Sequence, residues 1–208
     1  MSKNNKLLDK LIVIDVEASC YENNNWPKGE QQEIIEVGVC LLDLETLQIE
    51  NPRGLLIRPI KSSISPFCTQ LTTLTQQALE DGLTLVQAMS LLEKEYLISR
   101  RTWASWGDFD KKLLLKDCAD KGIKFPGEKS SHVNIKNLMA IFSGWNKEVG
   151  MDEALKRHNL SLAGVHHRGV YDAQNIAKLF KHLLKLTFQW NNLSSFSGND
   201  KDSFDEYH

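Results

Sequence analysis

The sequence predicts an α/β fold in which helices flank a mixed β-sheet. Leu11–Ile14 is a continuous apolar run, as expected for a central parallel strand that is buried on both faces. Two further strand-like segments, 33–44 and 47–59, follow each other across a tight turn. After residue 84, amphipathic segments alternate with short strand-like ones. This order of elements predicts a single mixed sheet with helices packed against it.

The composition is that of an ordinary globular protein. The chain has 208 residues, of which 41% are hydrophobic and 25% charged, enough for one domain with a sizeable core. A formal net charge of −2 lacks the basic signature of a protein that coats DNA, so any nucleic-acid contact must be local and metal-assisted. The four cysteines form no CxxC pair, which argues against zinc and disulfides and fits a reducing compartment. No apolar run approaches the roughly 18 residues of a membrane span, so we expect a cytoplasmic protein without a membrane partner.

The first half of the chain contains the predicted sheet and one clear helix. A polar segment, 1–10, precedes the first strand at 11–17, and a polar loop over 21–32 leads to the two paired strands. Short helical pieces follow a break at Pro66. Thr84 is the predicted N-cap of a helix whose apolar residues keep helical spacing, namely Leu85, Ala88, Met89, Leu92 and Tyr96.

The second half alternates between strands and helices. We expect a strand at 101–106, a helix from 108 to 121 that ends at Gly122, and a strand at 132–135 leading into a helix that ends at residue 142. A short helix at 151–158 and a final helix at 170–186 follow. After Thr187 the chain is rich in Asn, Ser, Asp and Gly, which cannot support a core. We therefore predict one domain over 11–186 and a disordered tail over 187–208.

Asp15 and Glu17 lie at the carboxyl end of the buried first strand. Residues two apart in a strand point to the same face, and ligands of open α/β sheets bind beyond this end of the strands. Two carboxylates held together there are costly unless a cation lies between them, so a divalent metal is the natural candidate. The spacing alone is weak evidence, because Asp43 and Glu45 repeat it in a predicted turn, where acidic residues are common.

A second acidic motif, Trp106-Gly107-Asp108-Phe109-Asp110, follows the 101–106 strand and opens a helix. Asp108 is the predicted cap of that helix. Asp110, two residues later, is the better candidate to face a metal.

A third motif combines His167 with Asp172, five residues later. Asp172 opens the last helix, whereas His167 lies in a loop beside Gly169. An acid on a helix and a base on a flexible loop suit a metal-assisted hydrolase.

Asp15-x-Glu17, Asp110 and His167-x4-Asp172 together resemble the DEDDh (DnaQ-like) superfamily of 3′–5′ exonucleases. The branch with KapD-like sporulation-inhibitor proteins and the eukaryotic exonucleases that trim histone mRNA, small interfering RNA and ribosomal RNA ends is the most similar. The resemblance covers about 11–186. Further motifs that support it are Asp15-Val16-Glu17-Ala18-Ser19, Glu33-Ile34-Ile35-Glu36-Val37-Gly38, Leu71-Thr72-x-Leu74-Thr75 and Asn134-Ile135-Lys136. The family pattern, in which the acid follows an aromatic residue, again selects Asp110 over Asp108.

The resemblance implies a ribonuclease H-like fold and a site for two Mg²⁺ or Mn²⁺ ions, which oxygen ligands suit better than zinc. In that family scheme Asp15 bridges the ions, Glu17 and Asp172 bind the ion beside the nucleophile, and Asp110 serves the other ion through water. His167, in its neutral form, accepts the proton of the attacking water.

Further residues are candidates for contacts with the substrate. Backbone N–H groups of Ala18 and Ser19 would meet the 3′-terminal nucleotide, Phe109 would line the same cleft, and Glu36 would bind a sugar hydroxyl. Arg168 and the lysines of the 108–121 helix (Lys111, Lys112 and Lys116) would contact phosphates, although charged helix faces are usually just solvated.

The expected function is release of nucleoside 5′-monophosphates from the 3′ end of single-stranded nucleic acid, with RNA preferred because the similar branch acts on RNA. A DNA-directed exonuclease and a non-catalytic regulator on the same fold are the alternatives. The presence of all four acids and the histidine argues against the regulator.

Overall fold

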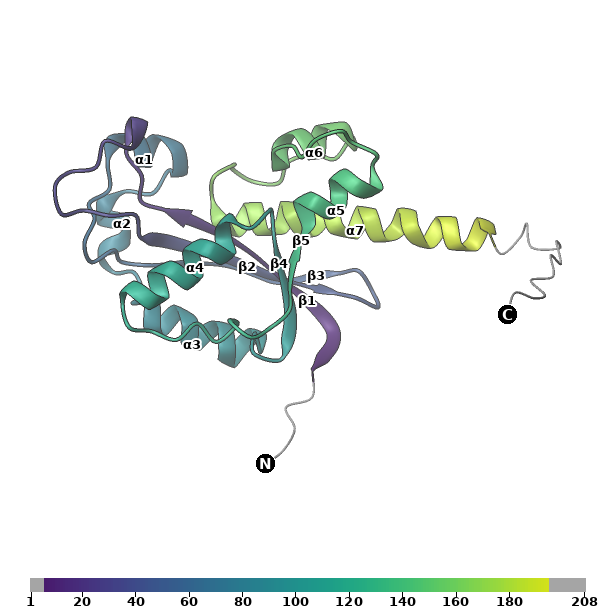
Figure 1. Cartoon of the computed structure of the whole chain (residues 1–208), viewed down its shortest axis with the longest axis horizontal. Coiled ribbons are helices and arrows are strands. Elements are labelled where there is room, and N and C mark those ends of the chain that lie inside the picture. Colours follow the sequence, from purple (N-terminus) through teal and green to yellow (C-terminus); the bar gives the residue numbers. More distant parts are fainter. Residues whose placement is uncertain (1–5, 195–208) are drawn as a thin grey trace, which may run out of the picture.

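The computed structural model describes residues 6–194 of the chain, with side chains through residue 187. Five strands form one mixed sheet in the order β3-β2-β1-β4-β5, and helices cover both of its faces (Figure 1). The strands are β1 (Leu7–Ala18), β2 (Ile34–Asp43), β3 (Ile49–Leu56), β4 (Arg101–Ser105) and β5 (His132–Asn134). The predicted fold class is confirmed.

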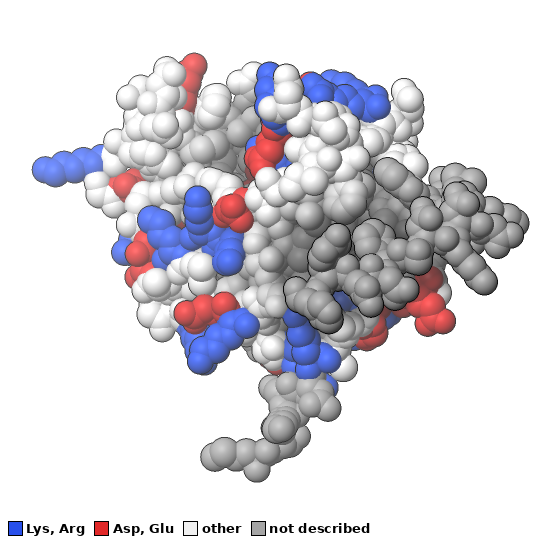
Figure 2. Space-filling model, turned by 45° about the vertical axis from the view of Figure 1, so that its right-hand side comes forward, with Lys and Arg blue, Asp and Glu red and all other residues white. Residues whose placement is uncertain are grey.

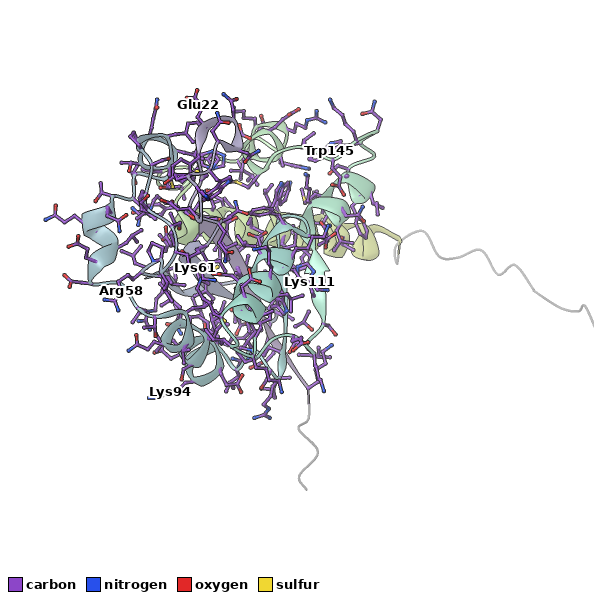
Figure 3. All side chains as sticks on the ribbon, turned by 60° about the vertical axis from the view of Figure 1, so that its left-hand side comes forward. Glu22, Arg58, Lys61, Lys94, Lys111 and Trp145 are labelled. Atoms are coloured by element: carbon purple, nitrogen blue, oxygen red, sulfur yellow. The ribbon has the colours of Figure 1, made fainter. Side chains whose placement is uncertain are left out.

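The central strand β1 sends its side chains alternately into two separate cores. Ile12, Ile14 and Val16 belong to the core beneath α3 (Leu85–Tyr96) and α4 (Phe109–Asp120), whereas Leu11 and Val13 belong to the core beneath the helices of the other face. Those helices are α5 (Ile135–Phe142), α6 (Met151–Arg157) and α7 (Gly169–Ser194). By the same alternation, Asp15 and Glu17 continue the row of Leu11 and Val13 and face the side of α7. Side chains from the sheet and helices fill both layers (Figure 3).

Strand pairing leaves the carboxyl end of β1 open on one side only. β2 pairs antiparallel with β1, with Asp15 opposite Gly38, and the register shifts at a bulge between Glu17 and Ala18. On the other side, the parallel pairing of β1 with β4 ends at Val13 and Ala104. The backbone of β1 beyond Val13 is therefore free of β4 and can be bound by a side chain.

A glycine contact docks the start of α7 beside Asp15. A Cβ atom on Gly38 would lie 1.8 Å from the carbonyl carbon of Gly169. Only a residue without a side chain permits this approach of the two backbones. The glycine opposite Asp15 thus brings the first turn of α7 to the acidic end of β1.

The shorter elements follow the predicted pattern closely. Thr84 caps α3 with a full capping box, in which Gln87 returns the hydrogen bond. Gly122 follows α4 with φ +65°, the left-handed conformation expected after a helix. The short helical pieces are α1 (Pro66–Thr72) and α2 (Gln76–Glu80), and a single 3₁₀ turn, η1 (Glu22–Asn24), lies in the polar loop.

Two boundaries differ from the prediction. β1 begins at Leu7, inside the segment predicted to be a polar N-terminal extension, and α7 continues to Ser194 instead of ending near residue 186. Leu7 pairs with Arg101 of β4 at the start of the strand, and Leu8 and Asp9 are exposed, which explains why polar residues are tolerated in the extension of β1. The remainder of the predicted tail, 195–208, lies outside the described residues. Among the described helices, none combines the length and the apolar character needed to cross a bilayer.

Candidate active site

The predicted acids and histidine line one pocket of about 260 Å³ at the carboxyl end of β1. Four elements meet there: β1, the start of α4, the start of α6 and the loop that enters α7. The lining residues are Asp15, Glu17, Trp106, Phe109, Asp110, Gly150, Met151, Asp152, His166, His167 and Asp172. Residues separated by more than 150 positions in the sequence are therefore brought to one place by the sheet.

Three carboxylates converge closely enough to share a cation. One oxygen from each of Asp15, Glu17 and Asp172 lies within 4.8 Å of the others. Asp15 and Glu17 come from the α7-facing row of β1, and Asp172 comes from the first turn of α7, where the helix dipole favours a negative charge.

Asp110 completes the acidic group from the opposite side of β1. Its Oδ1 accepts a hydrogen bond of 2.9 Å from the backbone N–H of Val16, the residue between Asp15 and Glu17. That N–H is beyond the last pair of the β1–β4 ladder, so the side chain of Asp110 takes the place of a neighbouring strand. The hydrogen bond ties the start of α4 to the acidic end of β1.

Burial and mutual repulsion make these carboxylates hard to ionise. Burial, followed by the charges of Asp110, Glu17 and Asp172, raises the pKa of Asp15 well above its usual value. Burial and the charge of Asp172 raise the pKa of Glu17 to about 8, and burial raises the pKa of Asp110 to about 6. Burial also raises the pKa of Asp172. A bound cation would reverse these shifts, because it favours the charged form of every acid around it.

Two adjacent histidines contact Asp172 in different ways. Nδ1 of His166 lies 3.0 Å from Oδ2 of Asp172, whereas His167 donates its backbone N–H to the same oxygen at 2.8 Å. The two rings stack with centroids 3.9 Å apart. The φ angle of His167 is +63°, an uncommon conformation for a residue other than glycine. The backbone of His167 thus holds Asp172 while its ring remains in the pocket.

The His167 loop is held from beneath by Glu36. This fully buried residue of β2 accepts hydrogen bonds from Nε of Arg168 at 3.0 Å and from the backbone N–H groups of Gly169 and Val170 at 3.2 and 3.3 Å. Nη1 of Arg168 also reaches Thr73 at 3.5 Å. Glu36 therefore caps α7 and fixes the loop that carries both histidines.

The residues predicted to contact substrate differ in where they lie relative to the pocket. Glu36 is not among the residues that line the pocket, and its carboxylate accepts from Arg168 and the start of α7, so its contact with a sugar hydroxyl stays a prediction. Arg168 is turned to Glu36 as well. The backbone N–H of Ser19 donates to Glu33 at 2.8 Å, which removes it as a donor to a nucleotide. Ala18 lies at the bulge, next to the pocket but not on its lining. Phe109 does line the pocket, with 55% of its surface exposed.

Asp108 is the N-cap residue of α4, as predicted. Its side chain forms no capping hydrogen bond with α4, and it lies instead near β5, where it accepts from Asn134 at 3.3 Å. Of the α4 lysines, Lys116 pairs with Asp120 at 2.8 Å, and Lys111 lies on the same helix (Figure 3). Their contact with phosphates stays a prediction.

Sequence reasoning missed His166 and Asp152 on the pocket lining. His166 directly precedes the predicted base, and its partner Asp172 is part of the predicted motif, so the double histidine is the available signal. Asp152 begins α6, where an acidic residue is ordinary because it complements the helix dipole. Nothing in the sequence distinguishes it from such a residue.

A family model described as Exonuclease (RNase T) matches residues 12–180 of the chain. The chain belongs to this exonuclease family. Asp15, Glu17, Asp110, His167 and Asp172 all fall inside the matched range.

Similar proteins agree with that assignment. The chain is 27% identical to the 3′–5′ exonuclease Snipper of Drosophila melanogaster, over 84% of this chain and 69% of Snipper. It is 30% identical to 3′–5′ exoribonuclease 1 of Homo sapiens, over 85% of this chain and 53% of that protein. It spans about half or less of several other relatives, such as 29% of ERI1 exoribonuclease 2 of Xenopus laevis.

Solved structures show the same fold. The nuclease domain of 3′hExo, described as a DEDDh family member bound to rAMP, has a TM-score of 0.75 and 27% identity, covering 87% of this chain and 94% of that one. The predicted superfamily of 3′–5′ exonucleases, with its ribonuclease H-like fold and dependence on metal, is thereby confirmed at the level of the family.

Proposed function

We propose that this chain is a two-metal 3′–5′ exonuclease that removes nucleoside 5′-monophosphates from the 3′ end of single-stranded RNA. The convergence of the Asp15, Glu17 and Asp172 oxygens within 4.8 Å carries the proposal. Asp110 and His167 in the same pocket supply the other two groups that a DEDDh enzyme requires.

The donor set fits Mg²⁺ or Mn²⁺. All four acids offer hard oxygen ligands, and their raised pKa values indicate that the cluster by itself lacks compensating positive charge. In this assignment Asp15 would bind both ions, Glu17 and Asp172 one of them, and Asp110 the other. When bound, two such ions stabilise the charge on the attacking and leaving oxygens of an in-line displacement.

The proposal assigns proton transfer to the chain itself. The ring of His167 lines the pocket, whereas the ring that pairs with Asp172 is that of His166. Burial and the neighbouring His166 lower the pKa of His167, which keeps the ring neutral and able to accept a proton. The positive φ of His167 places this ring while its backbone still holds Asp172.

In this proposal, exposed groups at the entrance of the pocket bind the nucleotide. A volume of about 260 Å³ is below the ~300–1,000 Å³ of pockets that enclose a whole small ligand. The terminal nucleotide would therefore enter only in part, with its base outside against Phe109, whose exposed ring suits stacking. Basic and acidic side chains are intermingled on the face shown in Figure 2. That face therefore offers no continuous basic surface for binding a substrate.

The preference for RNA rests on relatives. Human 3′–5′ exoribonuclease 1 is named for RNA, and a second 3′-exonuclease structure, with a TM-score of 0.76 and 26% identity, covers 88% of this chain and concerns recognition of the histone mRNA stem-loop. DNA-bound exonuclease I structures are 10% identical and support only the shared fold. A DNA-directed exonuclease is the second candidate, and a non-catalytic regulator is disfavoured by the complete acidic cluster.

A direct test compares Asp15→Asn with a matched control, Asp43→Asn, on end-labelled RNA and DNA oligonucleotides with Mg²⁺ or Mn²⁺. Asp43 belongs to the second Asp-x-Glu pair, and it bonds Thr46 and Glu45 in an exposed turn. We expect stepwise shortening from the 3′ end by the native protein and by Asp43→Asn, and a loss of about a thousandfold in Asp15→Asn, since metal stabilisation of the transition state is worth several kcal/mol.

Shortening that survives Asp15→Asn would contradict the site assignment. Turnover of DNA alone would overturn the preference for RNA, and absence of turnover by the native protein on either polymer would favour the regulator.

A further inference from the structure

A second pocket lies at the end of the sheet opposite the acidic cluster, where β4 begins. It has a volume of about 160 Å³ and is lined by four basic residues, three serines and no acidic residue. The basic residues are Lys6, Arg100, Arg101 and Lys129. In a chain with a formal net charge of −2, this is a local concentration of positive charge.

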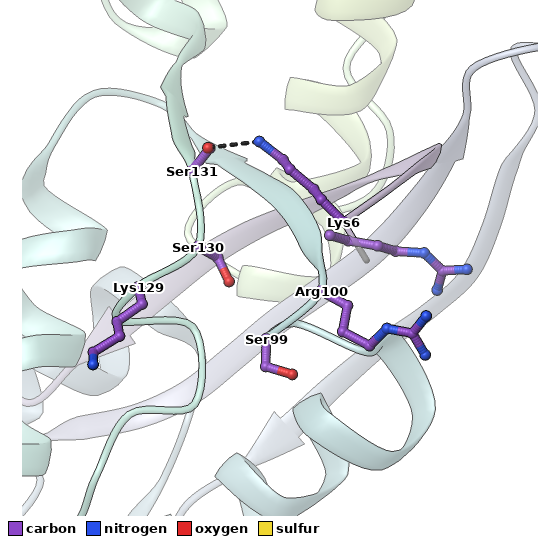
Figure 4. A pocket seen from close by; sticks show the side chains of 7 residues that line it. Lys6, Ser99, Arg100, Lys129, Ser130 and Ser131 are labelled. Atoms are coloured by element: carbon purple, nitrogen blue, oxygen red, sulfur yellow. Dashed lines mark hydrogen bonds between the residues drawn. The ribbon is translucent and has the colours of Figure 1, made fainter. Parts of the chain in front are cut away.

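The polar groups are arranged across the pocket, not around a single point. Figure 4 shows Lys129 and Arg100 extending to opposite sides, with Ser130 and Ser99 between them. Exposed or half-exposed groups in such a row can follow a ligand that passes over the pocket. A linear polyanion fits this arrangement better than a small compact anion does.

Several contacts hold the lining in place and occupy part of its donors. Oγ of Ser99 donates to Glu93 at 2.7 Å, and Oγ of Ser130 donates to the carbonyl of Ile98 at 2.5 Å. Nζ of Lys6 donates to Oγ of Ser131 at 2.7 Å, so two ammonium N–H groups and the Ser131 proton remain for a ligand (Figure 4). The guanidinium of Arg101 bonds Asp9 at 2.6 and 3.0 Å. Asp9 thus fixes the buried Arg101 and offsets its charge, so the exposed Lys6 and Lys129 are the positive groups that the test below removes.

Size limits what can enter. The volume equals about five times the ~30 Å³ that one water molecule occupies in the liquid. It is well below the ~300–1,000 Å³ of pockets that enclose nucleotides and similar ligands. A phosphate group with one or two waters matches this volume, and a base and sugar would extend beyond it.

We propose that this pocket binds a phosphate of the nucleic-acid backbone, upstream of the 3′ end that occupies the active site. This inference rests on the proposed function. Leu7, at the pocket end of β1, pairs with Arg101, and Glu17 lies ten residues further along the strand. At ~3.3 Å per residue the two sites are about 33 Å apart.

That separation sets a length requirement on the nucleic acid. At ~3.4 Å per nucleotide of a helical strand, about ten nucleotides span the distance. A substrate of ~4 nucleotides reaches only the active site, while one of ~30 nucleotides can contact both. The pocket therefore anchors long substrates and has no effect on short ones.

The test measures binding of fluorescent RNA of ~4 and ~30 nucleotides by anisotropy, in EDTA so that no cleavage occurs. The pocket variant is Lys6→Gln/Lys129→Gln. The matched control is Lys61→Gln/Lys185→Gln, which removes the same charge from exposed positions on the loop before α1 and on α7. Single-strand contacts contribute a slope of about 0.7 each to log K against log salt, which corresponds to about fivefold per contact at ~0.1 M salt.

We expect the pocket variant to lose roughly five- to twenty-fold in affinity for the long RNA and to show a smaller salt slope by about 0.7–1.4. Its affinity for the short RNA, and its rate of trimming that RNA with metal, should equal those of the control.

Equal losses for both lengths, or for both variants, would overturn the proposal. Protection of the pocket by inorganic phosphate without a length effect would overturn the assignment to the nucleic-acid backbone. Failure of the native protein to trim short RNA would instead refute the proposed function and leave the binding result intact.

Discussion

At the scale of single residues, the two adjacent histidines contact Asp172 in different ways. The ring of His166 pairs with Asp172, whereas His167 contributes its backbone N–H to that acid and keeps its ring free of it. The sequence shows two adjacent histidines but not which one contacts Asp172 through its ring and which through its backbone. That difference depends on the left-handed φ of His167. The assignment of His167 as the base rests on its position in the family pattern and stays a prediction.

The pH profile of activity tests that assignment. The pKa of His167 is lowered by burial and by His166, so its neutral form prevails above a pH that lies below the ordinary ~6.5. At saturating metal, we expect the rate to rise with pH through that lowered value and then level off. His167→Ala should lose about 10²–10⁴-fold in kcat and lose the rising limb.

His166→Ala is the matched control for this experiment. It should keep the rising limb and lose less than about tenfold, because the ring it removes acts on Asp172 and not on the attacking water. If the limb instead disappears in His166→Ala and persists in His167→Ala, then His166 is the base.

The acids show what sequence can and cannot establish about single residues. Asp15 and Glu17 are predictable because a carboxylate at the end of a buried apolar strand is rarely a solvated surface charge, whereas Asp43 and Glu45 are set apart by their turn. The sequence did not predict that Glu36 holds the start of α7, since this role depends on three donors from residues more than 130 positions away. Long-range hydrogen bonds of this kind leave no local pattern.

At the scale of elements, the entry of α7 is the part of the fold on which the site depends most. Gly38 allows the backbone of Gly169 to approach, and Glu36 neutralises the first turn of the helix and Arg168. Both residues belong to β2, which also pairs with the acidic end of β1. One strand therefore sets the position of Asp172 relative to Asp15.

Glu36→Gln tests this docking. The substitution keeps the shape and one acceptor but removes the charge that faces Arg168 and the α7 N-terminus, so it should cost about 1–3 kcal/mol. For a chain of this size that corresponds to a fall in Tm of roughly 2–12 °C. We also expect kcat to fall with little change in KM, because Asp172 and His167 move while the exposed face of Phe109 does not. Thermal denaturation and steady-state kinetics measure the two effects.

Glu45→Gln serves as the control, because Glu45 is exposed in the β2–β3 turn. It should leave both Tm and kcat within error of the native values. A Glu36→Gln variant with native Tm but reduced kcat would contradict a positioning role and support a direct contact with substrate.

Element types are predictable from the sequence, and element ends less so. Alternation and capping signals at Thr84 and Gly122 identify α3 and the end of α4 because they are local. The extension of β1 to Leu7 is set by pairing with Arg101, and the continuation of α7 to Ser194 has no local stop signal near residue 186. At the start of β1, strand pairing outweighs the polar composition of the segment. At the end of α7, continued helical hydrogen bonding outweighs it.

At the scale of the whole molecule, the acidic cluster links folding stability to pH and to metal. In the fold without metal, Glu17 keeps its proton up to a pKa of about 8, whereas in the unfolded chain it releases it near 4.5. Asp15, Asp110 and Asp172 are shifted in the same direction. Between these values the cluster holds more protons in the folded state than in the unfolded one, so its contribution to stability falls as pH rises.

Metal should reverse this trend. It binds the ionised carboxylates, which are unfavourable in the folded cluster as long as no cation is bound. We expect the Tm of the EDTA-treated protein to fall between about pH 6 and about pH 8. Saturating Mg²⁺ or Mn²⁺ at ~100 times its Kd should add about 2.7 kcal/mol, or roughly 5–10 °C, with the larger increment at the higher pH where fewer protons compete. Asp15→Asn should abolish the increment and Asp43→Asn should retain it. A metal-free Tm that rises across this range, or an increment that is independent of pH, would show that the four carboxylates do not form one metal-binding unit.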